Sequence, residues 1–364
     1  MANIFHDVEA AACTRGSVLD VGPWRVHFPK VFGFCGGVLK ALKALEQALQ
    51  VRDGGDTWLL GEIIHSDTVN AFFRAQGVRI LAETEVESVF SKAQPDDCFV
   101  IPAFGIAREL EVRVRAYCGA RGRVIDTTCD YIRRVWQFAE RVALEGRTIV
   151  IHGKPDHPET RATLSRALTG GNAVIQVPDY PAAKCLAACL TAGDVSDYPV
   201  HLVHNRGNLD TRRLALINQT TMLYLETCEI ESLLAAAIRS TGGDLARAET
   251  LCRATQSRQN AALELCRRGC DVMLVVGGYA SSNTTQLHRL ARKHGPAYFI
   301  SSAAALAADR ITHYEPALGD VVLTQPWLPE GTRDIGLLAG ASCPPSDIGA
   351  VIRRLRQIAV EAAG

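Results

Sequence analysis

A short apolar strand, a turn and an amphipathic helix follow one another repeatedly along this chain of 364 residues. The clearest strand and turn segments are CFVIPAFG at 98–105, TIVIHG at 148–153 and DVMLVVGG at 271–278, each with a helical pattern after it. This alternation is typical of parallel α/β units. Anionic ligands bind such sheets at the carboxyl ends of the strands, where helix N-termini point their amides. The sequence therefore predicts an α/β fold with its site at these turns.

The composition favours small partners. The 39 basic and 39 acidic residues balance, and neither sign forms a long run, so nothing points to nucleic acid or an anionic membrane. The N-terminal segment has no apolar core of signal-peptide length, and no later stretch approaches the roughly 18 apolar residues of a membrane span. We expect a cytoplasmic protein of two or three packed units.

Three cysteines, Cys35, Cys129 and Cys252, each lie beside the start of a predicted helix. A helix N-terminus favours the thiolate that metals bind. In a chain without a secretory signal, such residues are metal ligands, reduced thiols or small buried residues. Three distant cysteines alone leave these alternatives open. If they share a four-iron cluster, one iron lacks a protein ligand and is open to substrate, which indicates catalysis.

Short motifs around these cysteines occur in a fixed order. They are GFCGGV at 33–38, GEIIHS at 61–66, DTTCD at 126–130, DHPE at 156–159, NQTT at 218–221, CRATQSRQ at 252–259, GGYASSN at 277–283 and AGAS at 339–342. Together they resemble the 4-hydroxy-3-methylbut-2-enyl diphosphate reductase family, which acts in the last step of the non-mevalonate isoprenoid pathway. The resemblance covers most of the chain.

The resemblance implies three similar α/β units in a trefoil around a central 4Fe-4S cluster. Cys35, Cys129 and Cys252 match the residues that hold this cluster. The expected parts of the chain are an N-terminal extension at 1–22, a first unit at 23–127 with Cys35, a second at 128–230 with Cys129, a third at 231–335 with Cys252, and a segment at 336–364 that returns to the first unit.

The resemblance also implies the chemistry. Glu159 matches the carboxylate that supplies protons, and Thr220 matches the hydroxyl beside it. Two electrons and protons remove the substrate's hydroxyl as water, leaving isopentenyl and dimethylallyl diphosphate. Because hydroxide is a poor leaving group, a positioned acid beside a Lewis-acidic iron helps it to leave. No GxGxxG follows a strand, so the electrons are expected from outside, as from ferredoxin or flavodoxin.

The diphosphate requires hydrogen-bond donors. The residues that match the family's donors are His65, His157, Ser281, Ser282, Asn283 and Ser342. A small polar turn such as GGYASSN offers backbone amides and side-chain donors to an oxyanion, although the same turn also serves as a plain helix cap. A histidine such as His65 is, taken alone, more often an ordinary loop residue.

The chain departs from the family chiefly on the diphosphate side. Phe104 stands where the family has a third diphosphate histidine, and losing such a charge-assisted hydrogen bond costs about 1.5–3 kcal/mol of anion binding. Asp130 replaces a proline, Ser66 an asparagine and Phe32 a basic residue. Three hypotheses follow: a divergent diphosphate reductase, a paralogue that reduces a less anionic hydroxylated substrate, or a non-catalytic protein that binds a cluster or zinc.

Two segments look loosest. One is the first twenty or so residues, and the other is 177–199, where proline, glycine and aspartate cluster. We expect the second to be an insertion or surface excursion.

Overall fold

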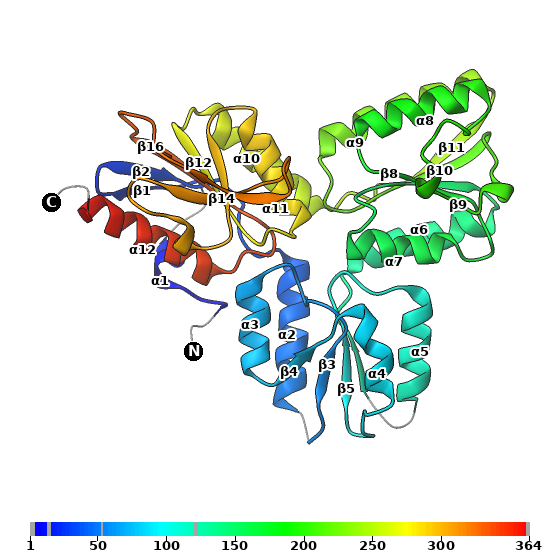
Figure 1. The fold of residues 1–364 in the computed structure, drawn as a ribbon, viewed down its shortest axis with the longest axis horizontal. Coiled ribbons are helices and arrows are strands. Elements are labelled where there is room, and N and C mark those ends of the chain that lie inside the picture. The colour runs from blue at the N-terminus through cyan, green and yellow to red at the C-terminus, as the bar shows by residue number, and fades with distance from the viewer. Residues whose placement is uncertain (1–3, 13–15, 52–53, 120–122, 362–364) are drawn as a thin grey trace. The chain divides into compact units, whose positions relative to one another are not determined.

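The computed structural model describes residues 4–12, 16–51, 54–119 and 123–361, and their strands form three separate sheets (Figure 1). Two compact units divide the described chain. The terminal unit takes in the described parts of Met1–Leu39, Ile64–Gly77 and Arg253–Gly364. The internal unit takes in those of Lys40–Ile63 and Val78–Cys252. The α/β class with three sheets agrees with the sequence-based prediction.

The terminal unit is built on a seven-stranded sheet. In sheet order the strands are β1 (Val18–Val21), β2 (Trp24–His27), β16 (Asp334–Ala339), β12 (Val272–Val276), β13 (Ala297–Ile300), β14 (Ile311–Glu315) and β15 (Asp320–Thr324). From β2 to β13 the neighbours run parallel. The helices are α1 (Val8–Ala12), α3 (Asp67–Ala75), α10 (Arg253–Arg267), α11 (Ser282–Arg292) and α12 (Pro345–Glu361), with a 3-10 turn η4 (Ala303–Ala305).

Strand β12 is apolar at every position because both faces of this sheet are covered. Val272, Leu274 and Val276 join the core that α12 completes. Met273 and Val275 lie in the core formed with α10 and α11. A continuous apolar run is the pattern expected of a parallel strand between two helical layers.

The internal unit contains a five-stranded sheet. In order its strands are β11 (Asp244–Arg247), β10 (Arg213–Asn218), β7 (Thr148–His152), β8 (Val174–Val177) and β9 (Val203–His204). Figure 1 shows α8 (Tyr180–Ala192) and α9 (Tyr224–Ser240) on one face, and α6 (Asp130–Leu144) and α7 (Pro158–Ala167) on the other. Two short turns, η2 (Val200–Leu202) and η3 (Arg206–Asn208), precede and follow β9. Alternate residues of β7 enter the two cores: Val150 faces α8 and α9, while Ile149 and Ile151 face α6 and α7.

The same unit contains a parallel four-stranded sheet. Its order is β4 (Val78–Ile80), β3 (Thr57–Leu59), β5 (Cys98–Ile101) and β6 (Arg123–Asp126). Helices α4 (Val86–Phe90) and α5 (Arg108–Cys118) share a core with these strands, and a 3-10 turn η1 (Glu83–Glu85) precedes α4. Helix α2 (Gly36–Gln50) follows Cys35 and runs from the terminal into the internal unit.

Strand pairing groups parts of the chain differently from the expected boundaries. Strand β2 pairs with β16, in keeping with the expected return of 336–364 to the start of the chain, but the two strands belong to another sheet than β3 to β6. Strand β11 was expected in the third unit but pairs with β10 of the five-stranded sheet. Local patterns identify strands but not their pairing partners, which explains these differences. The remaining boundaries stay predictions.

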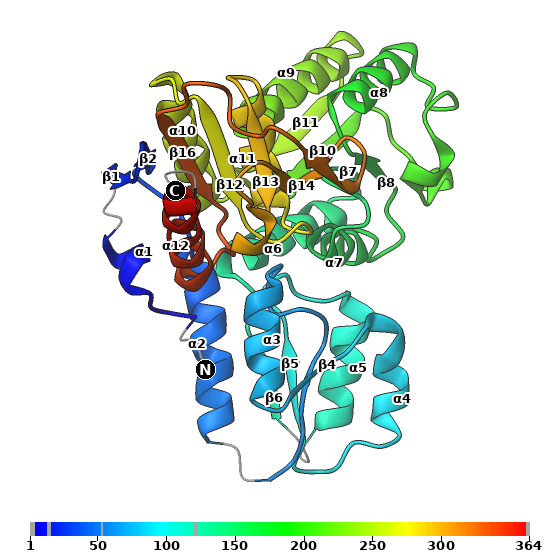
Figure 2. The same cartoon turned by 60° about the vertical axis from the view of Figure 1, so that its left-hand side comes forward.

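The two segments that looked loose are ordered where the structure describes them. Residues 180–192 form α8, which begins at the N-cap Asp179 and ends at Gly193 in the left-handed conformation. The aspartate, proline and glycine of 177–199 are therefore helix start and stop signals, and the prediction of a surface excursion was wrong. At the N-terminus, α1 lies beside α12 (Figure 2), and Asp7 accepts a 3.0 Å hydrogen bond from Arg353.

Candidate functional site

Glu159 and Thr220 form a buried pair joined by two hydrogen bonds in the internal unit. The Thr220 N–H donates to Glu159 Oε1 at 2.6 Å, and the Thr220 hydroxyl donates to Oε2 at 2.9 Å. Glu159 is 2% exposed, and this burial raises the pKa of its carboxyl to about 7, although both bonds from Thr220 favour the carboxylate. A carboxyl with such a pKa exchanges a proton near neutral pH, as a catalytic acid must.

The sheet explains why these distant residues meet. Strands β7 and β10 are parallel neighbours, and their carboxyl ends lead to α7 and to the NQTT motif respectively. The Gln219 N–H donates to the His152 carbonyl at 2.8 Å. Gly153 permits this approach, because a Cβ there would lie only 2.7 Å from the Gln219 Cβ. Glu159, in the first turn of α7, thus reaches the residue after Gln219.

Two of the three predicted cysteine ligands belong to the same unit. Cys129 is the N-cap of α6, and its N–H donates to the Ala103 carbonyl at 3.0 Å. Cys252 directly precedes α10, and its N–H donates to the Thr220 carbonyl at 3.2 Å. Thr220 therefore bonds to both Glu159 and the backbone of Cys252. This connects the candidate acid directly with a candidate metal ligand.

His157 and Phe104 lie beside this pair. His157 is the N-cap of α7, and its Nδ1 accepts the Glu159 N–H at 3.2 Å. A neutral imidazole that accepts at Nδ1 has its proton on Nε2, which is then the donor. The Phe104 ring meets the His157 ring edge to face, with centroids 5.6 Å apart. Phe104, which replaces a family histidine, thus contacts His157, a candidate diphosphate donor.

The terminal unit gathers the remaining candidate donors around the start of α11. Ser281 is the N-cap, and its Oγ accepts from the Thr284 N–H at 3.3 Å and from the Ser342 hydroxyl at 3.3 Å. Asn283 Oδ1 accepts the Ala341 N–H at 2.9 Å. The Ser282 hydroxyl and the Asn283 amide nitrogen are buried, with no hydrogen-bond partner in the described structure.

Unsatisfied buried donors are costly, and here they cluster at a helix N-terminus. An anion would satisfy them, which supports the predicted oxyanion role of the GGYASSN motif beyond that of a plain cap. The start of α11 is therefore a candidate anion site, and its role toward a diphosphate stays a prediction.

Cys35 and His65 lie at the same edge of this sheet. The Cys35 N–H donates to the Ala341 carbonyl at 3.2 Å, one residue before Ser342. Its Sγ accepts the Val38 N–H at 3.4 Å, as a helix cap does. Buried His65 lies close to the GGYASSN turn, since a Cβ at Gly278 would lie only 2.5 Å from the His65 carbonyl oxygen.

The described cysteines differ in burial and in their place on the helices. Cys35, Cys129 and Cys252 are half-buried at helix starts. Burial instead raises the pKa of Cys98 and Cys266 to about 11, which favours inert thiols. None of the cysteines in the described ranges forms a disulfide. Within those ranges no three His, Cys, Asp or Glu side chains lie together as a metal site, so joint ligation by the three cysteines stays a prediction.

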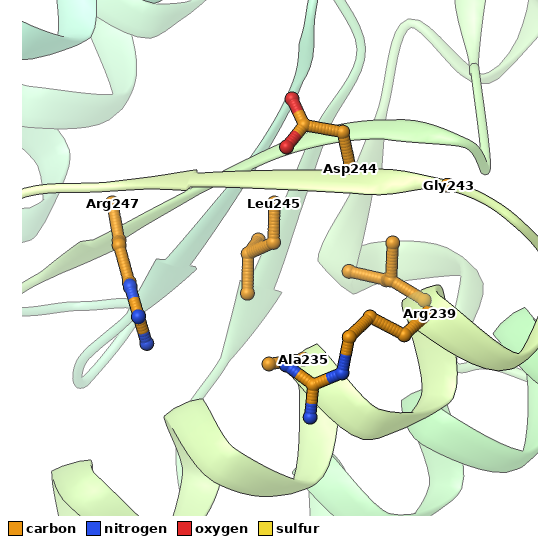
Figure 3. Close-up of a pocket in the computed structure, with 7 residues that line it drawn as sticks. Ala235, Arg239, Gly243, Asp244, Leu245 and Arg247 are labelled. Atoms are coloured by element: carbon orange, nitrogen blue, oxygen red, sulfur yellow. The ribbon is translucent and has the colours of Figure 1, made fainter.

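A cavity of about 160 Å³ lies elsewhere in the internal unit, between α9 and β11. Figure 3 shows Leu245 and Arg247 extending from β11 and Arg239 from the helix. It contains none of the predicted site residues. We therefore do not assign the reaction to it.

Two buried arginines next to the site were missed from the sequence. Arg258 donates to the Gly33 carbonyl at 2.7 Å, two residues before Cys35. Arg166 donates to the Ile106 carbonyl at 2.9 Å, two residues after Phe104. Arg258 lies inside the CRATQSRQ motif, so its position was available as a signal. Arg166 had no such signal, because arginine on a helix is usually exposed.

Comparison with known proteins gives one consistent family. The sequence profile of the LytB protein family matches residues 26–356. The chain is 33% identical over 380 residues to a 4-hydroxy-3-methylbut-2-enyl diphosphate reductase from Gloeobacter violaceus, covering 98% of this chain and 87% of that protein. A protein of the same name from Synechocystis sp. is 31% identical over 353 residues, covering 93% of this chain and 91% of that protein.

Solved structures are similar over the same extent. The E-1-hydroxy-2-methyl-but-2-enyl-4-diphosphate reductase from Plasmodium falciparum gives a TM-score of 0.66 at 20% identity, covering 93% of this chain and 87% of that chain. A structure of (E)-4-hydroxy-3-methyl-but-2-enyl diphosphate reductase gives 0.56 at 25% identity, covering 91% and 99%. These similarities confirm the predicted fold class.

Proposed function

Because this chain belongs to the LytB protein family, we propose that it reduces 4-hydroxy-3-methylbut-2-enyl diphosphate to isopentenyl and dimethylallyl diphosphate. The reaction takes up two electrons and two protons. The C–O bond breaks, one proton leaves with the hydroxyl group as water, and the other ends in a new C–H bond. The observation that carries the proposal is the buried Glu159 carboxyl, held by Thr220 and poised to exchange a proton near pH 7.

Cys35, Cys129 and Cys252 are the residues that would hold a 4Fe-4S cluster. Their sites fit it, since each thiol lies at a helix start and is half-buried rather than enclosed. When bound, the cluster would pass on the electrons of the external carrier and would offer a Lewis-acidic iron to the substrate. The Cys252 N–H donates to the Thr220 carbonyl. This bond links the backbone of Cys252 to the residue that orients the Glu159 carboxyl.

Glu159 acts as the acid in this proposal. Its low exposure keeps solvent from competing for the proton, and Thr220 orients both carboxylate oxygens. Protonating the departing hydroxyl turns a poor leaving group into water. His157 is a candidate substrate donor in this proposal, and its Nδ1 accepts the Glu159 N–H, which places it next to the acid.

In this proposal the diphosphate binds to the donors that match those of the family. Ser282 and Asn283 offer a hydroxyl and an amide that lack other partners in the described structure. Ser281, Ser342, His65 and His157 complete the set. Electrons come from an external carrier such as ferredoxin or flavodoxin, and the protein works in the cytoplasm. No described helix is long and apolar enough to cross a membrane.

One observation favours a second candidate. Phe104 places an apolar ring edge against His157. This contact suits a substrate whose anchor is smaller or less charged, reduced by the same cysteines and the same acid. The family relationship supports the diphosphate reductase over this paralogue and over a non-catalytic cluster or zinc protein.

The test is anaerobic turnover by the reconstituted protein with a chemically reduced dye as electron source. 4-Hydroxy-3-methylbut-2-enyl diphosphate and the corresponding alcohol without phosphates are supplied separately, with Glu159→Gln as the chemical control. The proposal expects wild type to convert the diphosphate and the variant to be nearly inactive. Turnover of the alcohol alone would establish the second candidate, and an intact cluster with no turnover of either would support the non-catalytic one.

A further inference from the structure

Arg166 of α7 is an almost fully buried cation, 3% exposed. Its guanidinium carbon lies 3.3 Å from the centroid of the Trp136 ring. One terminal nitrogen donates to the carbonyls of Ile106 and Ala162 at 2.9 and 3.0 Å, and the other donates to the Glu111 carboxylate. One face of the guanidinium and both of its terminal nitrogens therefore have defined contacts.

The elements that Arg166 joins are those that carry the candidate site of the internal unit. Ile106 lies in the turn with Phe104. Trp136 is on α6, whose N-cap is Cys129, and Arg166 is on α7, which begins with His157 and Glu159. One guanidinium thus connects the turn, the helix of a candidate metal ligand and the helix of the candidate acid.

Packing at Gly105 shows how closely the turn lies on this contact. Gly105 has φ +74, and a Cβ there would overlap the Trp136 ring. The Trp136 indole N–H has no hydrogen-bond partner in the described part of the chain, so ring-face contacts hold the side chain. A second bond, from the Arg108 N–H to Ser165 Oγ at 2.9 Å, ties the same turn to α7.

A buried ion pair of this kind contributes little to the stability of a fold, because removing its charges from water is unfavourable. Burial lowers the pKa of Arg166, while the nearby Glu111 carboxylate raises it. Replacing a buried ion pair with apolar side chains is often neutral or stabilising, so stability alone explains it poorly. What a planar guanidinium adds is direction, through one stacking face and several fixed donors.

We infer that Arg166 is a positioning residue, which sets the placement of the Glu159 acid relative to Cys129 and the Phe104 turn. This inference rests on the proposed function and adds a residue that acts only through its neighbours. Lysine retains the positive charge but has neither the planar stacking face nor the forked N–H donors of a guanidinium. Arg166→Lys therefore tests the geometric role separately from the charge. An error of about 1 Å in such placement costs about 10²-fold in rate.

Arg147 provides a matched control. It is also an internal-unit arginine, 15% exposed, bonded to the Leu214 carbonyl and to the carboxylates of Asp244 and Glu145. It lies at the amino ends of β7, β10 and β11, away from the turns that carry the site. Arg147→Lys therefore removes a similar interaction away from the Phe104 turn and from the helix starts at Cys129 and Glu159, since its contact with α6 is at the opposite, C-terminal end of that helix.

Two readouts on the reconstituted protein test the inference. In steady-state turnover, Arg166→Lys is expected to lower kcat about 10²-fold with KM changed by less than about threefold, and Arg147→Lys to leave both nearly unchanged. In amide hydrogen exchange, Arg166→Lys is expected to speed exchange at Arg108, Cys129 and Glu159 about tenfold, and Arg147→Lys to leave these amides protected.

Equal effects of the two lysine variants on both readouts would overturn the inference. If Arg166→Lys does not accumulate as folded protein, Trp136→Phe removes the indole face instead and is judged by the same criteria. Should the wild type fail to turn over the diphosphate, the proposed function fails, and the exchange comparison still decides whether Arg166 holds these elements together.

Discussion

Thr220 donates its backbone N–H and its hydroxyl to the two carboxylate oxygens of Glu159, at 2.6 and 2.9 Å. The same residue accepts the N–H of Cys252 through its carbonyl. One threonine therefore orients the candidate acid and touches a candidate metal ligand. The geometry makes the protonation of Glu159 the most direct property to test.

Changing this pair is expected to change the pH dependence of the rate. The acid form of Glu159 is active, so kcat falls as pH rises through the carboxyl pKa of about 7. Thr220→Val removes a hydroxyl bond that lowers this pKa, so the fall moves to higher pH. Glu159→Gln is expected to lower kcat by about 10²–10⁴-fold. The remaining activity should no longer fall as pH rises through about 7.

The control for this profile is Thr221→Val. The Thr221 hydroxyl accepts from the Gln219 side chain at 2.8 Å, whereas the two hydrogen bonds to the Glu159 carboxylate described above both come from Thr220. Its pH profile should match wild type. A Thr220→Val profile identical to wild type would show that another group controls the rate.

Phe104→His is expected to improve binding of the diphosphate. A new donor beside His157 replaces an apolar ring, and a hydrogen bond to a charged group contributes about 1.5 kcal/mol or more, so KM should fall about tenfold. Phe104→Leu, which adds no donor, should show no such gain. An unchanged KM in the histidine variant would place the diphosphate away from this turn.

Asn283→Asp tests the donor cluster at the start of α11. The Oδ1 acceptor for the Ala341 N–H is retained, but the partnerless amide becomes an anionic oxygen. Repulsion of the diphosphate should raise KM by about 100-fold or more. Ser282→Ala loses one donor and should raise KM by only about tenfold, with the fold intact by circular dichroism. Equal KM values in both variants would argue against an anion here.

Single substitutions of Cys35, Cys129 and Cys252 by serine test cluster ligation. Each variant should bind less iron and lose absorbance near 400 nm after anaerobic reconstitution. Cys228→Ser is the control, because Cys228 is also half-buried but lies within α9. A cysteine whose variant retains full iron content is not a ligand.

Asp347 is expected to make stability depend on pH. Burial raises its carboxyl pKa to about 6, while the Thr68 hydroxyl bond opposes this. Between the unfolded value near 4 and about 6 the folded protein binds the proton more tightly, so stability falls as pH rises through this window. Asp347→Asn should therefore raise Tm more at pH 8 than at pH 5. The exposed Asp320→Asn should show no such difference.

Local patterns in the sequence predicted much of the secondary structure. The apolar positions after Cys129, namely Ile132, Val135, Phe138, Ala139 and Val142, are all buried in α6. The strand and helix pairs at 98–118, 148–167 and 271–292 also appear where expected. These features depend on residues close in the chain, where periodicity and capping act directly.

Pairings between distant residues came from family resemblance or were missed. Glu159 and Thr220 are 61 positions apart, and no periodicity links them. The sequence alone suggests that Arg166 is a surface residue. In the folded protein it contacts Trp136, Ile106 and Glu111. The pairing of β2 with β16 joins strands from opposite ends of the chain.

The sequence by itself determined the α/β alternation, the helix starts at the three cysteines and, by its motifs, the family. Only the tertiary structure decided that α8 is a packed helix, that burial raises the pKa of the Glu159 carboxyl to about 7, and that Arg166 lies inside the protein. Propensity and periodicity act over a few residues. Burial, and the pKa shifts and charge pairing that follow from it, depend on segments that meet only when the chain folds.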